Sequence, residues 1–155
     1  RQRPSLIDMA HHVQPDGRVH GVVAAIRRDD GRWLCVRRSR HVAAPLKVCF
    51  PGGGIDAGES QEQAIIREMR EELGIDVRPV TRTWTQVIPS RDLVLHGWRC
   101  EHVAGELRPD PAEIDEVLWL HSHEAVAHPD AMPTNRDFIL TLDPHSVDGP
   151  LASCR

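Results

Sequence analysis

Three glutamates, Glu68, Glu71 and Glu72, are spaced so that they share one face of a predicted helix. Residues three and four positions apart are neighbours on a helix surface, and like charges at these spacings cost about 0.2–0.5 kcal/mol per pair. The negative end of the helix dipole disfavours carboxylates there as well. A divalent cation would convert this cost into a binding site, because hard cations prefer clustered oxygen ligands. The alternative interpretation is a solvated acidic face.

The helix that carries these glutamates has clear start and stop signals. Ser60 is a suitable N-cap, Gln63 completes a capping box, and Gly74 stands where the helix should end. An apolar stripe at helical spacing predicts the packed side, displaced from the three glutamates: Ile65, Ile66, Met69 and Leu73. We therefore expect one side of the helix to pack and the acidic side to point outward.

The residues before and within this helix form a longer pattern. From Gly53 the sequence runs G-x5-E-x7-R-E-U-x-E-E-x-G-U, with Met69 a mild departure at the first aliphatic position. Seven fixed letters, each with a chance of roughly one in fifteen, make an accidental match improbable. The pattern resembles the signature box of the Nudix hydrolases, and the resemblance extends from about residue 21 to about residue 142.

The resemblance implies a site for Mg²⁺ or Mn²⁺ in which a carbonyl and three carboxylates are the ligands: Gly53, Glu68, Glu71 and Glu72. It also implies that Glu59 supports the site and that Arg67 orients the carboxylates. The glycines of 51–54 fit this role, because a Cβ would obstruct the approach of metal and phosphate. Bound metal would bridge a diphosphate and activate water for attack on phosphorus.

The general base is left open between two regions. In some relatives it is the glutamate that corresponds to Glu68, and in others it is a carboxylate of a later loop. Glu113 and Glu116 stand in a stretch of acids that also holds Asp110 and Asp115. Either could be the base or a fourth ligand, and we place Glu116 among the catalytic candidates. An exposed acidic loop is the alternative.

Substrate-binding candidates come from similarity to the MutT-type subgroup, which cleaves nucleoside triphosphates to monophosphate and pyrophosphate. Arg38 ends a predicted strand at the spacing of that subgroup, and Phe50 precedes the glycine run. Asn135 lies in a Pro-x-Asn segment whose asparagine reads an oxidised guanine in MutT enzymes. Thr134 and Asn135 also fit simple helix capping, and Arg38 a surface role. Gly54 departs from the subgroup, which can place a basic residue there.

Other substrates and a second class of function remain as alternatives. Pro89 stands fourteen residues beyond Ile75, which keeps ADP-ribose or another nucleotide sugar open. The long aromatic motif of NADH pyrophosphatases is not visible. A Nudix-fold module that senses a nucleotide without cleaving it is a different class, but such modules usually lose box carboxylates. Since this chain keeps every one, the pattern predicts a hydrolase.

The composition is that of an ordinary globular domain. The 155 residues are 40% apolar and 27% charged, with a net charge of −4 that argues against a nucleic-acid partner. The longest apolar stretch, 22–26, is too short to cross a bilayer, and residues 1–20 lack the apolar run of a signal peptide. The four cysteines form no C-x-x-C pair, so we expect reduced thiols in a cytoplasmic protein. The partner expected is a small nucleotide, with a homodimer left open.

The elements around the box predict an α/β fold, a Nudix-type α/β/α sandwich with a mixed β-sheet between two helices. We expect a hairpin of strands 21–26 and 33–38, irregular backbone at 51–54, strands 84–88, 93–101 and 117–120, and a helix over 135–142 capped by Thr134. The domain division is an N-terminal segment 1–20, a Nudix hydrolase domain 21–142 and a loose C-terminal tail 143–155.

Overall fold

The computed structural model describes residues 13–145, so the predicted N-terminal segment and tail are described only at 13–20 and 143–145. The elements in chain order are β1 (Val19–Ile26), β2 (Trp33–Arg38), β3 (Val48–Cys49), β4 (Gly52–Gly54), α1 (Gln61–Leu73), β5 (Asp76–Ile88), the 3₁₀ turn η2 (Pro89–Arg91), β6 (Leu93–Ala104), β7 (Ile114–Leu120), α2 (Ser122–Ala127) and α3 (Thr134–Leu142). No helix within residues 13–145 is long and apolar enough to span a bilayer.

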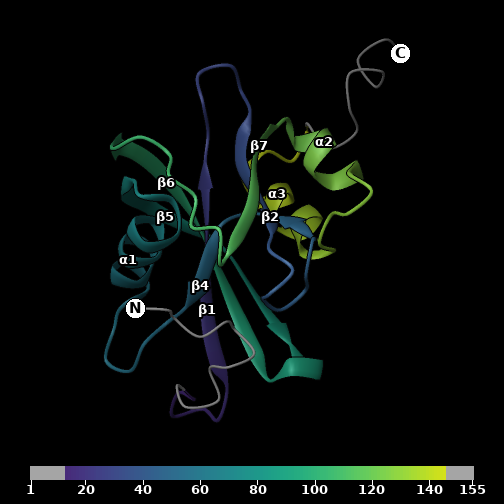
Figure 1. Cartoon of the computed structure of the whole chain (residues 1–155). Helices are drawn as coiled ribbons and strands as arrows, with labels where there is room; N and C mark the ends of the chain where they lie inside the picture. The colour runs from purple at the N-terminus through teal and green to yellow at the C-terminus, as the bar shows by residue number, and fades with distance from the viewer. Residues whose placement is uncertain (1–12, 146–155) are drawn as a thin grey trace.

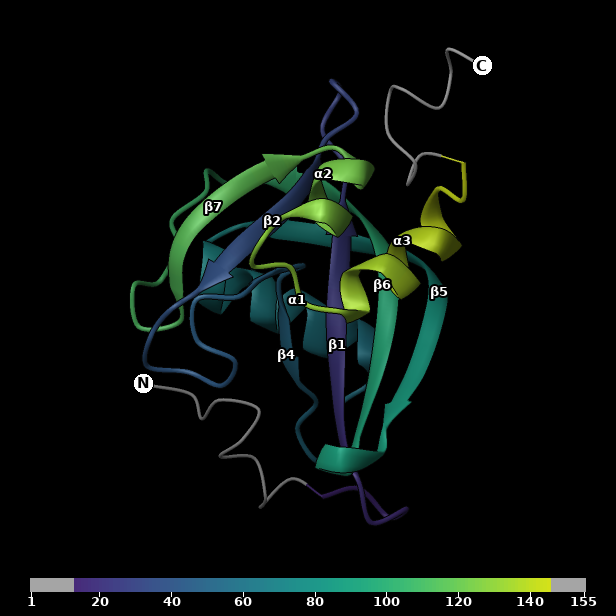
Figure 2. The same ribbon diagram turned by 90° about the vertical axis from the view of Figure 1, so that its right-hand side faces the viewer.

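The strands form two sheets with helices on both sides (Figure 1). The first sheet has the order β4-β1-β6-β5 and is mixed, because β1 and β6 run parallel while the other neighbours are antiparallel. The second sheet has the order β3-β2-β7. Figure 2 shows α1 behind the strands of the first sheet and α3 in front of them. The α/β/α sandwich with a mixed sheet is therefore confirmed, with the strands divided between two sheets.

Helix α1 begins and ends where the sequence predicts. Ser60 accepts a hydrogen bond from the Gln63 amide in a complete capping box, and Gly74 takes the left-handed conformation, with φ of 68°. The buried face comprises Ala64, Ile65, Glu68, Met69 and Leu73. Glu68 differs from the prediction: we expected it on the outward face of the helix, but it is buried with the apolar residues. The acidic face is thus partly inside the protein.

The predicted hairpin is present as a turn but not as a paired ribbon. The Arg28 amide donates to the Arg32 carbonyl at 2.8 Å, and an isolated bridge joins Arg27 to Trp33. Beyond this bridge β1 enters the first sheet and β2 the second. Both strands have buried side chains on both faces, so each is covered by a different partner rather than by the other. The expectation of a two-stranded unit was therefore wrong.

The glycine run forms a strand, where we expected irregular backbone. Gly52, Gly53 and Gly54 pair antiparallel with Val23, Val22 and Gly21 of β1. A Cβ on Gly52 would lie 1.9 Å from the Val22 carbonyl oxygen, so the close approach of the two strands requires glycine. This pairing fixes β4 against the middle of β1.

Several other boundaries differ from the expectation. β5 begins at Asp76 instead of residue 84, and Pro79 is tolerated because β5 is an edge strand with three register shifts. β6 continues to Ala104, β7 begins at Ile114, and α2 was not predicted. These extensions consist of polar and proline-containing stretches that lack an alternating apolar pattern.

The capping role assigned to Thr134 was also wrong. Thr134 is the first helical residue of α3, Pro133 precedes it, and no side chain caps the helix. Thr134 instead lines a cavity described below.

A row of polar side chains in mutual contact connects the start of β1 with β6. The Asp16 carboxylate lies 2.8 Å from Nε2 of His20, and Nδ1 of His20 lies 2.9 Å from Nε2 of His96. Nδ1 of His96 faces the Thr85 hydroxyl at 3.4 Å. Burial, followed by the nearby His20 and Arg82, lowers the pKa of His96 to about 4. His96 is therefore neutral in the folded protein at neutral pH.

We predict that this histidine makes folding sensitive to moderate acid. Unfolded histidine has a pKa near 6.5, so below that pH the unfolded chain binds a proton that folded His96 rejects until about pH 4. The free energy of unfolding should fall by about 1–2 kcal/mol as the pH drops through this window. In His96→Gln the free energy of unfolding should not show this decrease between about pH 6.5 and pH 4. Urea unfolding at several pH values measures it, and equal slopes in both proteins would contradict the prediction.

Candidate active site

One arginine side chain organises the acidic face of α1. Arg67 donates from Nε to Glu59 at 2.7 Å and from Nη2 to both the same carboxylate and the Gly54 carbonyl at 2.8 Å. Its Nη1 donates to Glu68 at 2.7 Å and to Glu71 at 3.4 Å. A guanidinium has five N–H donors, and these five bonds account for all of them. Arg67 thus contacts Glu59, Glu68 and Glu71 at once, and its role in orienting the carboxylates, with the support of Glu59, stays a prediction.

Gly53 of β4 lies directly against the buried glutamate of α1. A Cβ on Gly53 would be 2.4–2.6 Å from the carboxylate atoms of Glu68, so a larger residue would displace that side chain. The strand pairing with Val22 fixes Gly53 from the other side. The glycine therefore brings a backbone segment into contact with the acidic cluster.

The carboxylates of α1 are held together at a cost in electrostatic energy. Burial raises the pKa of Glu68, with Arg67 acting against the rise. Burial also raises the pKa of Glu72 well above its usual range, and the charges of Glu68 and Glu113 add to the effect. Carboxylates that repel each other in this way favour the approach of a proton or another cation.

The loop after β6 brings a further acid to this cluster. The amides of Arg108 and Asp110 donate to the carbonyls of Leu73 and Glu72, at 2.7 and 2.8 Å, and so cap the end of α1. Glu113 follows this loop. Burial and then the Glu68 charge raise the pKa of Glu113.

Glu116, which we placed among the catalytic candidates, lies elsewhere. It is on β7, its side chain is 52% exposed, and its ion-pair partner at 3.5 Å is Arg37. Strand pairing explains this, because Glu116 and Arg37 are direct cross-strand neighbours. The structure thus brings Glu113, not Glu116, to the carboxylates of α1.

The donor set has the chemistry that a hard divalent cation requires. The Glu68 carboxylate lies against Gly53, where a Cβ would stand, and repulsion from Glu68 and Glu113 raises the pKa of Glu72. Glu68, Glu71 and Glu72 with the Gly53 carbonyl would hold the ion. Within residues 13–145 no three acidic, histidine or cysteine side chains already converge as a ligand set. Binding would therefore require Glu68 or Glu71 to turn away from Arg67.

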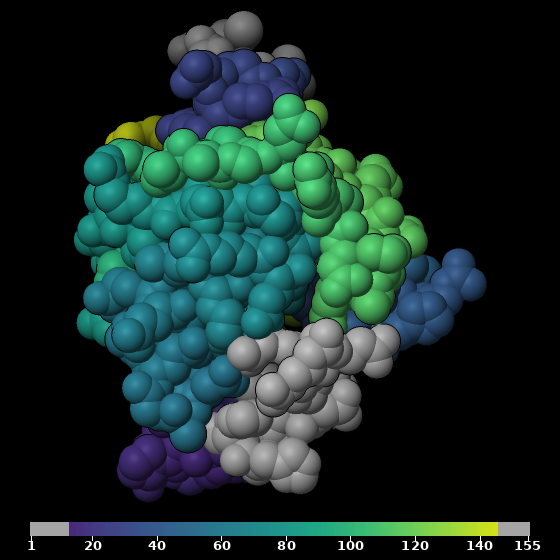
Figure 3. All heavy atoms as spheres, turned by 60° about the vertical axis from the view of Figure 1, so that its left-hand side comes forward, coloured from purple at the N-terminus to yellow at the C-terminus, as the bar shows by residue number. Residues whose placement is uncertain are grey.

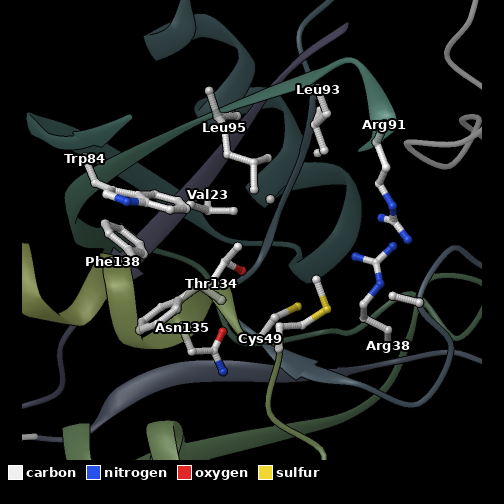
Figure 4. A pocket seen from close by; sticks show the side chains of 16 residues that line it. Val23, Arg38, Cys49, Trp84, Arg91, Leu93, Leu95, Thr134, Asn135 and Phe138 are labelled. Atoms are coloured by element: carbon white, nitrogen blue, oxygen red, sulfur yellow. The ribbon is translucent and has the colours of Figure 1, made fainter. Parts of the chain in front are cut away.

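A cavity opens beside β4, on the face of the first sheet opposite α1. It measures about 620 Å³ with its open mouth. Its lining is largely apolar, with a few polar groups: Val22, Val23, Arg38, Ala44, Cys49, Phe50, Gly52, Gly53, Trp84, Arg91, Leu93, Leu95, Met132, Thr134, Asn135 and Phe138. Trp84 and Phe138 stack in parallel, with ring centroids 5.4 Å apart (Figure 4). All three predicted substrate-binding residues lie in this lining.

Asn135 is oriented by the backbone and is not a helix cap. It is 2% exposed, and its Nδ2 donates to the carbonyls of Val48 and Ala125 at 3.0 and 3.1 Å. Only the amide nitrogen can donate, so these carbonyls determine which way the side chain faces. Figure 4 shows the amide oxygen on the side of the cavity. Asn135 therefore presents an acceptor, while both of its N–H groups are used in the interior.

Phe50 forms part of the apolar wall of the cavity. It is 3% exposed and packs edge-on against Trp33 and Phe138, with centroids 6.3 and 5.0 Å away. Its larger role is thus in the core beneath the cavity.

Two arginines face each other at one side of the cavity. Figure 4 shows the guanidinium groups of Arg38 and Arg91 pointing toward one another. Nε of Arg38 donates to the Ala43 carbonyl at 2.5 Å, and its charge acts on both Glu72 and Glu113. Arg38 therefore lies between the cavity and the acidic cluster.

Arg91 and Phe138 were not predicted from the sequence, and neither was the pairing of Trp84 with Phe138. Arg91 belongs to the short turn η2, whose only sequence signal was Pro89. The aromatic residues lie far apart in the chain and meet because α3 packs on β5. Pairing information between distant segments was needed to find them.

A model of the NUDIX domain family matches residues 17–142. The chain belongs to the Nudix family. The matched region contains α1, β4 and the whole cavity lining, so the box residues and the cavity are parts of one Nudix domain.

Two curated relatives illustrate the range of this family. The Nudix domain is 36% identical over 108 residues to the NAD-capped RNA hydrolase NudC of Stutzerimonas stutzeri (strain A1501), covering 70% of this chain and 38% of NudC. It is 34% identical over 110 residues to the CTP pyrophosphohydrolase of Escherichia coli (strain K12), covering 70% of this chain and 80% of that protein. The chain thus spans less than two fifths of the length of NudC.

Solved structures share the architecture. The MutT Nudix hydrolase of Burkholderia pseudomallei has a TM-score of 0.70 at 25% identity, covering 81% of this chain and 98% of that one. The MutT protein of Methanosarcina mazei Go1 has a TM-score of 0.71 at 23% identity, covering 82% and 94%, and supports the fold alone. The MutT-like resemblance is compatible with these neighbours.

We predict that Arg67→Lys destabilises the domain by about 2–3 kcal/mol, because three ammonium donors cannot replace five guanidinium bonds. Arg70→Lys on the same helix is the matched control. Arg70 is 65% exposed and bonds Asp76 at 2.6 Å, so its loss should cost less than about 0.5 kcal/mol. Urea unfolding compares the two variants, and equal effects would contradict the role assigned to Arg67.

Proposed function

We propose that this domain hydrolyses the diphosphate linkage of a nucleoside diphosphate-linked compound with the help of Mg²⁺ or Mn²⁺. The leading substrate is a nucleoside triphosphate, with an oxidised base among the candidates, cleaved to monophosphate and pyrophosphate. The observation that carries the proposal is that the aromatic cavity adjoins the carboxylate cluster through two of its lining residues. Gly53 lines the cavity and lies against Glu68, and Arg38 lines it while its charge acts on Glu72 and Glu113. The phosphates of a nucleotide bound in the cavity would thus lie near the residues that would hold the metal.

The cavity supplies the chemistry that a nucleobase requires. Its lining is mostly apolar with a few polar groups, as is usual for small-molecule sites. Trp84 and Phe138 form an aromatic wall, and Asn135 presents its amide oxygen as an acceptor. This acceptor favours a base that offers an N–H group at that edge.

The phosphates would lie between the two arginines and the acids. Guanidinium groups bind phosphate oxygens in a bidentate manner, which suits Arg38 and Arg91. When bound, the divalent cation neutralises phosphate charge and lowers the pKa of a coordinated water. Glu113 and Glu68 have raised pKa values, so either is suited to accept the proton that water loses as its oxygen bonds to phosphorus. The P–O bond of the anhydride bridge breaks in the same exchange, and its electron pair leaves with the bridging oxygen on the departing pyrophosphate or nucleoside monophosphate.

A dinucleotide of the NAD type is the second candidate substrate. The similarity to NudC, at 36% identity over 108 residues, favours it and reopens a class that the sequence pattern had set aside. ADP-ribose shares the same diphosphate chemistry. The cytoplasmic location, the homodimer and the absence of nucleic-acid partners stay predictions.

A product assay separates these candidates. Purified protein with Mg²⁺ is given nucleoside triphosphates, NAD and ADP-ribose, and the phosphorus products are identified. Pyrophosphate from a triphosphate would support the leading proposal, and AMP from NAD or ADP-ribose the second. Saturable binding of each nucleotide without any product would overturn hydrolysis and indicate a sensing module.

We predict that Glu71→Gln and Glu72→Gln each lower Mg²⁺-dependent turnover at least about 100-fold, because a metal ligand is lost. Glu72→Gln should not destabilise the fold, since the amide mimics the protonated carboxyl favoured there. Glu62→Gln, exposed on the first turn of α1, is the control and should retain turnover. Rates and thermal unfolding are compared, and full activity in both site variants would refute the assignment.

Arg91 and Arg38 should affect the reaction differently. Arg91→Gln should raise KM by about 5–20-fold with little change in kcat, as expected for loss of one exposed phosphate contact. Arg38→Gln should lower kcat as well, because the Arg38 charge also acts on Glu72 and Glu113. Steady-state kinetics on the best substrate measures both constants. A kcat loss in Arg91→Gln as large as in Arg38→Gln would contradict this division.

A further inference from the structure

A second cleft lies at the far end of β1, outside the site described above. It measures about 1260 Å³ with its open mouth, and the residues that line it include Arg27, Arg28, Trp33, Arg99, Glu101 and Trp119. None of these residues lines the first cavity. Along β1, Val22 in the first cavity and Ile26 here are about 13 Å apart at the rise of a strand.

The cleft exists because the two sheets separate at the β1–β2 turn. β1 continues into the first sheet and β2 into the second, so β6 and β7 face each other across the gap. Figure 3 shows the tip of this turn, in indigo, projecting above the green end of β6. The floor is apolar, with Ile26, Cys100 and Trp33 buried.

Two arginines of the turn are stacked on indole rings of the cleft. The Arg28 guanidinium carbon lies 4.6 Å from the centroid of Trp119, and that of Arg27 lies 4.7 Å from Trp33. These stacks hold planar cations against planar rings at two places in one cleft. Arg28 also bonds Asp30, and Arg27 bonds Asp143, but these pairs are solvent-exposed and are weak competitors for an anion.

A third arginine supplies charge that the described residues do not neutralise. Arg99 on β6 is exposed and has no ion-pair or hydrogen-bond partner within residues 13–145. Of the two acids in the lining, Glu101 is paired with Arg78 and Asp29 lies exposed on the turn. The cleft therefore combines planar stacking surfaces with available guanidinium donors.

From this juxtaposition we propose that the cleft is a second binding site, which takes a nucleotide: a planar base against the partly exposed stack of Arg28 on Trp119 and a phosphate on Arg99. Bases stack on indole rings and guanidinium planes, and arginine binds phosphate through paired N–H groups. The ligand is either a free nucleotide or one unit of a single-stranded oligonucleotide, which share this chemistry. The site is independent of the hydrolytic centre.

The test is NMR titration of the ¹⁵N-labelled protein with AMP, with a 5′-hydroxyl hexa-adenylate and with pyrophosphate. AMP or hexa-adenylate should shift the indole signal of Trp119, whereas Trp33 also packs against Phe50 of the first cavity and so does not separate the two sites. Arg99→Glu should raise the Kd read from the Trp119 signal at least about fivefold, and Arg99→Lys less than about twofold. Hydrolysis by Arg99→Glu should stay at the native rate, so this test and that of the catalytic proposal fail separately.

Arg82→Glu is the matched control for charge reversal. Arg82 is exposed on β5 opposite Trp98, which packs on the α1 face, whereas the next residue, Arg99, points to the other face. The Kd of AMP or hexa-adenylate for the Arg82→Glu variant should differ from that of the native protein by less than about twofold.

The outcomes separate the two sources and the failure of the proposal. Hexa-adenylate binding more than about tenfold tighter than AMP would identify a strand as the ligand, and similar affinities a free nucleotide. Shifts confined to Trp84 and Asn135, or a Kd unchanged in Arg99→Glu, would overturn the site. So would pyrophosphate alone producing the same shifts at the same Kd, since the base would then contribute nothing.

Discussion

The acidic face of α1 depends on the guanidinium group of Arg67. Its five N–H groups bond Glu59 twice, Glu68, Glu71 and the Gly54 carbonyl, so the donors match the acceptors without remainder. The arginine thereby joins the loop before α1, the helix itself and β4. Because it is only 17% exposed, these bonds form where water competes poorly, and each is stronger for it. A lysine in this place would leave acceptors without a donor.

The bonds to Arg67 also explain why the acids cluster as a cation would require, although their side chains do not yet converge on a single point within residues 13–145. Arg67 bonds Glu68 and Glu71, whereas the charges of Glu68 and Glu113 raise the pKa of Glu72. One guanidinium cannot neutralise this many carboxylates. A divalent ion would compete with Arg67 for their oxygen atoms, so metal affinity should depend on how readily the glutamates exchange between the two cations. Gly53 leaves room for that exchange, because no Cβ stands against Glu68.

Local chemistry in the sequence predicted α1 and the box because caps, helical spacing and charge lie within one short segment. The capping box at Ser60 and the left-handed Gly74 are determined by neighbours three to four residues away. Features set by distant pairing were not predictable in the same way. The glycine run became β4 because β1 lies beside it, and Glu113 reaches the acids because its loop caps α1, while Glu116 follows the β2–β7 register to Arg37. Glu113 and Glu116 are the same residue type three positions apart, so the sequence alone could not show which one reaches the acids of α1. The pairing of β2 with β7 decides it.

The separation of β1 from β2 shapes both hollows of the domain. If the two strands had paired along their length, one continuous sheet would cover the space where Phe50, Trp84 and Phe138 now meet. Instead the first sheet carries β4 and α1, and the second presents Arg38 at the end of β2. The first cavity lies where these two parts face each other, next to the acids, and the second cleft lies where they part at the turn. A single topological choice thus creates one aromatic, arginine-lined hollow beside the carboxylates and another remote from them, and only the first has the acids that hydrolysis requires.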